Sequence, residues 1–177
     1  MASPMETELK LRIPSTAPYR PLLAALGFRE TVPPQPESSV LWDRDGELRA
    51  AGSALRLRRF AGRTRLTWKE PKVPDALLKI RPELETDVED GEALEGILRA
   101  LGFAPVMAME KVRSVWAREE LEACLDETPF GCYLELEGDP QAIRSAMEGL
   151  GLAPDRAEPR SYPELYQARG LGVIPPR

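Results

Sequence analysis

The alternation of side chains over residues 6–13 places the strongest constraint on how this chain folds. Every second residue in this stretch is charged, and the residues between them are apolar except for Thr7. A period of two is typical of a β-strand, in which successive side chains point to opposite faces. The charged face carries two carboxylates followed by two cations, Glu6, Glu8, Lys10 and Arg12. Such a face could hold a metal ion at one end and an anion at the other.

Charged residues recur at the same spacing in later stretches of the chain. Further strands are predicted over residues 39–43, 53–59, 64–69, 78–88, 110–116, 121–127 and 132–137. Carboxylates share the two-residue spacing in the pairs Glu6/Glu8, Glu83/Glu85 and Glu135/Glu137. Cations share it in the pairs Arg56/Arg58, Lys79/Arg81 and Lys111/Arg113. A strand face that is only exposed to water does not need its carboxylates and its cations grouped in separate pairs. The pattern therefore favours a face that binds a ligand.

Helices are predicted where cap residues and glycines bracket short stretches. They are expected before Gly27, over residues 92–100, from Pro140 through Met147, and over residues 162–168. Residues 33–36, three prolines and a glutamine, are predicted to form an extended surface loop, and residues 48–52 a segment returning from a turn. One domain is expected over residues 1–170, followed by a loose tail over 171–177.

The composition argues against several kinds of site and partner. The 177 residues include no histidine, so the usual zinc sites and histidine-dependent nucleophiles are excluded. A net charge of −5 argues against a general nucleic-acid binder. Neither a long apolar run nor a secretory signal is recognisable, so we expect a cytoplasmic protein without a membrane partner. Cys124 and Cys132 are interpreted as reduced packing residues.

The charged strands fit two architectures. In an open antiparallel sheet, the charged face would lie in water and the leucine face against helices. In a closed barrel, the charged face would line the interior, and helices would partly cover the apolar exterior. A charged interior needs a bound metal and anion to offset the desolvation of its charges. Paired carboxylates suit Mg²⁺ or Mn²⁺, and paired cations suit the oxygens of a polyphosphate.

An ordered set of motifs resembles the CYTH family, which includes class IV adenylyl cyclases and thiamine triphosphatases and is also called the triphosphate tunnel metalloenzymes. The set begins with Glu-x-Glu-x-Lys at 6–10 and continues through 52–58, 67–69, 79–85, 111–113, 125–127 and 135–137 to 161–165. These motifs follow the family's order over nearly the whole chain. The resemblance implies an α+β fold, an eight-stranded antiparallel β-barrel that forms a triphosphate tunnel, with flanking helices.

The resemblance also implies roles for individual residues. The catalytic residues would be Lys10, Glu6 and Glu8. The ligands of Mg²⁺ or Mn²⁺, directly or through water, would be Glu6, Glu8, Glu83, Glu85, Asp126, Glu135 and Glu137. The triphosphate would be held by Lys10, Arg56, Arg58, Lys69, Lys79, Arg81, Lys111 and Arg113. For each residue, the alternative is an ion pair between neighbouring strands.

Two activities and one binding role are consistent with these residues. The first is a metal-dependent triphosphatase acting on inorganic triphosphate, ATP or thiamine triphosphate. The second is a class IV adenylyl cyclase that converts ATP to cyclic AMP and pyrophosphate, and the third is a non-catalytic module that binds polyphosphate or nucleotide. The family often has Tyr-Phe-Asp-Thr where this chain has Leu41-Trp42-Asp43-Arg44, so a tyrosine hydroxyl and a threonine hydroxyl are missing here. Trp42 could still stack on a substrate ring. Cyclases tend to carry His-Phe shortly before the first motif, and residues 1–5 contain neither, so we favour hydrolysis by a monomer or homodimer.

Overall fold

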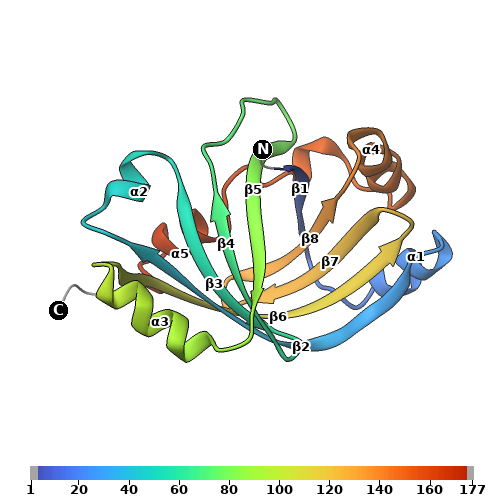
Figure 1. Ribbon diagram of the computed structural model, residues 1–177. Coiled ribbons are helices and arrows are strands. Elements are labelled where there is room, and N and C mark those ends of the chain that lie inside the picture. Colours follow the sequence, from blue (N-terminus) through green and yellow to red (C-terminus); the bar gives the residue numbers. More distant parts are fainter. Residues whose placement is uncertain (1–3, 175–177) are drawn as a thin grey trace.

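Eight antiparallel strands close into a barrel in the computed structural model, which describes residues 4–174 (Figure 1). The strands are β1 (Met5–Ile13), β2 (Arg29–Asp43), β3 (Ala54–Phe60), β4 (Arg63–Lys69), β5 (Lys79–Val88), β6 (Ala104–Arg118), β7 (Leu121–Thr128) and β8 (Gly131–Glu137). Around the barrel they follow the order β1, β5, β4, β3, β2, β6, β7, β8, and β8 pairs again with β1. The predicted closed barrel is therefore confirmed, and the open sheet is excluded.

Five α-helices and one 3₁₀ turn flank the strands within residues 4–174. They are α1 (Tyr19–Ala25), α2 (Glu47–Ala50), α3 (Gly91–Ala100), α4 (Pro140–Gly149) and α5 (Tyr162–Gln167), with the 3₁₀ turn at Pro154–Arg156. Asp90, Asp139 and Ser161 each accept hydrogen bonds from main-chain N–H groups in the first turn of α3, α4 and α5. These are the side chains that satisfy the free donors at a helix start, as the sequence predicted.

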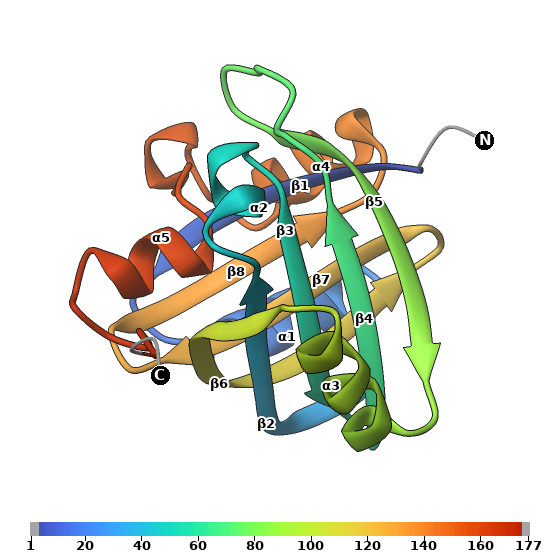
Figure 2. The ribbon, with the colours of Figure 1, turned by 60° about the vertical axis from the view of Figure 1, so that its left-hand side comes forward.

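Two of the three apolar clusters lie outside the barrel, between its wall and the helices, whereas the third, around Met107, Met109 and Tyr166, borders the barrel cavity. One cluster packs α1 and α4 on β1 and its neighbours, and it includes the fully buried Leu11, Leu23 and Ile143. A second cluster packs Leu98 of α3 on Leu57 of β3, and Figure 2 shows α3 crossing the outer face of β3 and β4. Because apolar side chains point outward to the helices, the charged side chains of the same strands point inward.

Two segments differ from the sequence expectation. Residues 33–36 are not a surface loop but part of β2, which pairs with β6 from Arg29 to Asp43. A register shift between Val32 and Gln35 leaves Pro33 and Pro34 out of the ladder, so their missing N–H groups cost no strand hydrogen bond. Residues 47–50, expected in part as a returning segment, form α2 because the Asp43 carboxylate accepts hydrogen bonds from main-chain N–H groups of residues 44, 48 and 49.

The end of the chain fills gaps at the edges of two strands. Past Glu8, β1 loses β5 as a partner, and Ala157 bridges to Leu11 in its place. Further on, the Ala108 N–H donates to the Gly172 carbonyl at 2.8 Å, so residues 171–174 lie along β6 and are not loose. Residues 175–177 of the predicted tail lie outside the described residues. No helix within residues 4–174 is long and apolar enough to cross a membrane.

Candidate active site

A cavity of about 1100 Å³ occupies the barrel interior and is lined by charged side chains from its strands. The lining includes every residue predicted to bind metal or triphosphate except Asp126: Glu6, Glu8, Lys10, Arg56, Arg58, Lys69, Lys79, Arg81, Glu83, Glu85, Lys111, Arg113, Glu135 and Glu137. Strand alternation explains this gathering, because the inward-facing positions of all neighbouring strands meet in one space.

Three glutamates form a row across neighbouring strands at one side of the cavity. Glu8 of β1 lies opposite Glu137 of β8, and Glu137 lies opposite Glu122 of β7. Like charges placed directly opposite destabilise a sheet. Partial loss of hydration, followed by the nearby carboxylates of Glu6 and Glu122, raises the pKa of Glu137 to about 8, while the residue as a whole remains exposed to solvent. Carboxylate oxygens under such mutual repulsion are a donor set that suits a hard divalent cation such as Mg²⁺ or Mn²⁺.

Lysines supply the positive charge beside these carboxylates. Lys79 Nζ lies 2.9 Å from Glu8 Oε1, and Lys69 Nζ lies 3.4 Å from Glu6 Oε2 and also contacts Glu83. Burial and a hydrogen bond with Glu6 raise the pKa of Glu83 to about 8. Across residues 4–174, no group of three or more acidic, cysteine or histidine side chains is arranged to hold a metal ion. Lys69 and Lys79 instead contact the carboxylates of Glu6 and Glu8.

Lys10 is held in a fixed position inside the barrel. Its Nζ lies 3.3 Å from Glu135 Oε1, donates to the Arg160 carbonyl at 3.2 Å, and lies 3.8 Å from the centre of the Tyr162 ring. Its side chain is only 1% exposed, and burial lowers the pKa of Lys10 to about 8. Partners from both β8 and the segment before α5 thus fix the ammonium group.

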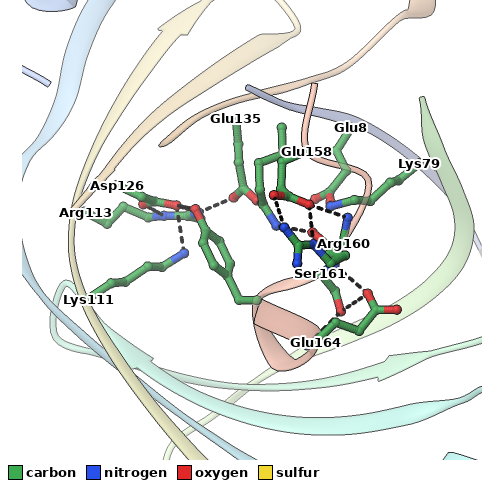
Figure 3. A network of polar contacts seen from close by, with 12 residues as sticks. Glu8, Lys79, Lys111, Arg113, Asp126, Glu135, Glu158, Arg160, Ser161 and Glu164 are labelled. Atoms are coloured by element: carbon green, nitrogen blue, oxygen red, sulfur yellow. Dashed lines mark hydrogen bonds and ion pairs between the residues drawn. The ribbon is translucent and has the colours of Figure 1, made fainter. Parts of the chain in front are cut away.

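Asp126, predicted as a metal ligand, lies behind the cavity lining, where basic side chains cover its carboxylate. Its Oδ1 accepts from Arg113 Nε and its Oδ2 from Arg113 Nη2, both at 2.6 Å, and Lys111 Nζ lies 3.0 Å from Oδ2 (Figure 3). The Tyr162 hydroxyl donates to the same oxygen. Both carboxylate oxygens are thus engaged by Arg113, Lys111 and Tyr162, and the metal-binding role of Asp126 stays a prediction.

Glu85 also has basic partners. Its carboxylate accepts from Thr67 at 2.7 Å and from Arg65 at 3.1 Å, and Arg56 lies 3.7 Å away. Burial opposes ionisation of this group, but the Thr67 hydrogen bond and the arginines lower the pKa of Glu85 overall. The carboxylate therefore neutralises arginines on β3 and β4, on a different wall of the cavity from the glutamate row.

Sequence reasoning missed three residues of this site. Glu37 is 4% exposed between Lys111 and Arg113, and it went unnoticed because β2 was expected to begin only at residue 39. Glu122 extends the glutamate row, and Tyr162 lies beside Lys10 and Lys111. The Glu-x-Cys-x-Asp spacing of β7 carried a signal for Glu122, and Tyr162 lies within the motif at 161–165 but was given no role. Trp42, which the sequence offered as a stacking residue, is 2% exposed in the core beneath α3.

The chain matches known proteins in both sequence and fold. A family model described as the CYTH domain matches residues 4–162. A protein of Methanocaldococcus jannaschii named "Putative adenylate cyclase" is 30% identical over 178 residues, which cover 94% of this chain and 99% of that protein.

Solved structures share the barrel at lower sequence identity. A "putative adenylate cyclase" from Vibrio parahaemolyticus aligns with a TM-score of 0.80 at 21% identity, over 93% of this chain and 99% of that one. HpAC1 from Hippeastrum, described with a dominant triphosphatase activity, aligns with a TM-score of 0.66 at 20% identity, over 96% and 98% of the two chains. These similarities establish the common fold.

Proposed function

Because the chain belongs to the CYTH domain family, we propose that it is a divalent-metal-dependent triphosphatase. Its substrate is inorganic triphosphate, or an organic one such as ATP or thiamine triphosphate, held inside the barrel. The observation that carries the proposal is that one cavity is lined both by carboxylates, among them Glu6, Glu8 and Glu137 of β1 and β8, and by cations, among them Arg56 and Arg58 of β3. The triphosphatase activity described for the Hippeastrum protein adds support.

We place the proposed metal among three carboxylates of β1 and β8. Glu6, Glu8 and Glu137 would hold Mg²⁺ or Mn²⁺, which when bound neutralises phosphate charge and activates water for attack on the terminal phosphorus. Lys10 would donate to a phosphate oxygen from its fixed position, and Arg56 and Arg58 would balance the charge that develops on the leaving diphosphate. The fixed placement of these donors before the reaction is what lowers the barrier.

A class IV adenylyl cyclase is the second candidate, and the name of the Methanocaldococcus jannaschii relative favours it. In that reaction the ribose hydroxyl attacks the α-phosphorus of ATP, and pyrophosphate leaves. The same carboxylates and cations would serve, with a different phosphorus placed next to the nucleophile.

The two candidates are separated by their products. Purified protein is incubated with Mg²⁺ or Mn²⁺ and either inorganic triphosphate or ATP, and phosphate, pyrophosphate and cyclic AMP are quantified. We expect phosphate without cyclic AMP, and a fall of about 100-fold or more in turnover for Glu8→Gln. Glu30→Gln, which removes the same charge at an Arg20 ion pair away from the cavity, serves as the control. Cyclic AMP with an equal amount of pyrophosphate would replace the proposal by the cyclase.

A further inference from the structure

An internal carboxylate occupies one end of the basic lining. Glu37 Oε1 lies 3.5 Å from Lys111 Nζ, and its Oε2 lies 3.6 Å from Arg113 Nε and 3.8 Å from Arg58 Nη1. All three cations are among those predicted to hold a triphosphate. Burial opposes ionisation of Glu37, yet these cations lower its pKa to about 2, so the carboxylate is charged at neutral pH. The same cations are therefore already balanced by an anion of the protein.

Glu37 is unlike the other carboxylates of the cavity in its hydrogen bonding. Its Oε2 is buried and accepts no hydrogen bond within residues 4–174, and the buried Ser39 hydroxyl two residues along β2 is also without a partner. A carboxylate oxygen can only accept hydrogen bonds, and so can the oxygens of an ionised phosphate. A phosphate that reached this point would meet an acceptor of like charge and gain no hydrogen bond from it.

The position of Glu37 separates two hollows of the barrel. The central cavity of about 1100 Å³ and a second hollow of about 720 Å³ both have Glu37 and Lys111 in their linings. The second hollow is also lined by Arg59 and Arg63, at the turn between β3 and β4. Glu37 and Lys111 lie opposite each other on β2 and β6, so this pair forms the partition between the hollows. Arg59 there contacts Glu95 of α3 at 2.7 Å, so it is already paired with a carboxylate.

We propose that Glu37 closes the inner end of the phosphate-binding lining, so that the protein gains no affinity from a phosphate chain longer than triphosphate. This inference rests on the proposed function for the identity of the substrate as a triphosphate. Glu37 is then a specificity-determining residue, because it withholds Arg58, Lys111 and Arg113 from an additional phosphate.

The test compares the affinities of two phosphate chains in the absence of turnover. Inorganic triphosphate and inorganic tetraphosphate are titrated by calorimetry into the metal-free protein, both as wild type and as Glu37→Gln. We expect the two chains to bind the wild type within about threefold of each other, and tetraphosphate to bind Glu37→Gln about tenfold more tightly than triphosphate. Glu30→Gln removes one charge elsewhere on β2 and should leave the ratio of the two affinities as in the wild type.

Two results would overturn the inference. In the first, Glu37→Gln raises both affinities by the same factor, which would assign Glu37 a general electrostatic effect without chain-length selection. In the second, the wild-type protein already binds tetraphosphate tenfold more tightly than triphosphate. That result would overturn the inference even if Glu37→Gln does not fold. Because binding is measured without metal, its outcome is separate from that of the phosphate-release assay: either can fail while the other holds.

Discussion

Asp126 illustrates how a buried charge can be structural within a site made for ligands. It is fully buried and holds Arg113, Lys111 and Tyr162 at once. We expect Asp126→Asn to lower the free energy of unfolding by about 3 kcal/mol, because Arg113 would keep its buried charge with one carboxylate fewer. Urea denaturation of the metal-free protein measures this. Unchanged stability together with weaker Mn²⁺ binding would instead identify Asp126 as a metal ligand.

Removing the charge of Glu137 should stabilise the protein at high pH, whereas removing that of Asp126 should destabilise it. Its pKa is raised to about 8 in the folded protein, so the stability that the protonated form provides is present below about pH 4.5 and is lost as the pH rises through 8. A glutamine at this position cannot ionise, and Glu137→Gln should therefore be more stable than the wild type at pH 8 but nearly equal to it at pH 5. Thermal denaturation in EDTA at the two pH values measures the difference. An equal difference at both pH values would rule out repulsion within the glutamate row as its cause.

At the scale of elements, the segment after α5 depends on close contact with β6. Gly172 has φ +73°, and a Cβ there would clash with the Ala108 carbonyl oxygen. Gly172→Ala should detach this segment and lower the free energy of unfolding by about 2 kcal/mol, through both strain and clash. Gly170→Ala is the matched control, because Gly170 also has a positive φ but no atom near the added Cβ. Equal losses for the two variants would show that the contact with β6 contributes nothing.

The elements also show what can be inferred from local sequence. Period-two alternation identified β1 and its inward face correctly, because that signal lies within the strand itself: Lys10 is buried in the cavity and Leu11 in the outer core. The first part of β2 was missed because its prolines lie at a register shift, which depends on pairing with β6. Glu37 was missed with it, since its contact with Lys111 is set by the same distant register.

For the whole molecule, the largest apolar cluster and the site lie on opposite sides of one barrel wall. Ile143 of α4 is fully buried in the outer cluster and does not line the cavity. Ile143→Ala should therefore lower the free energy of unfolding by about 2–4 kcal/mol, as expected for a core truncation, with unchanged triphosphate turnover by the folded fraction. Denaturation, and a turnover assay well below the thermal midpoint, test both parts. A loss of turnover without unfolding would mean that the outer core also shapes the cavity.

The pairing of β1 has a consequence for the order in which the protein folds during translation. One edge of this strand pairs with β8, and the other pairs first with β5 and then with Ala157, while Lys10 donates to a carbonyl 150 residues away in the sequence. Contacts of such separation slow folding, because long loops must be ordered before they form. The earliest of the eight strands in sequence is thus among the last to be completed, and the barrel cannot close around Lys10 until Tyr162 has been synthesised.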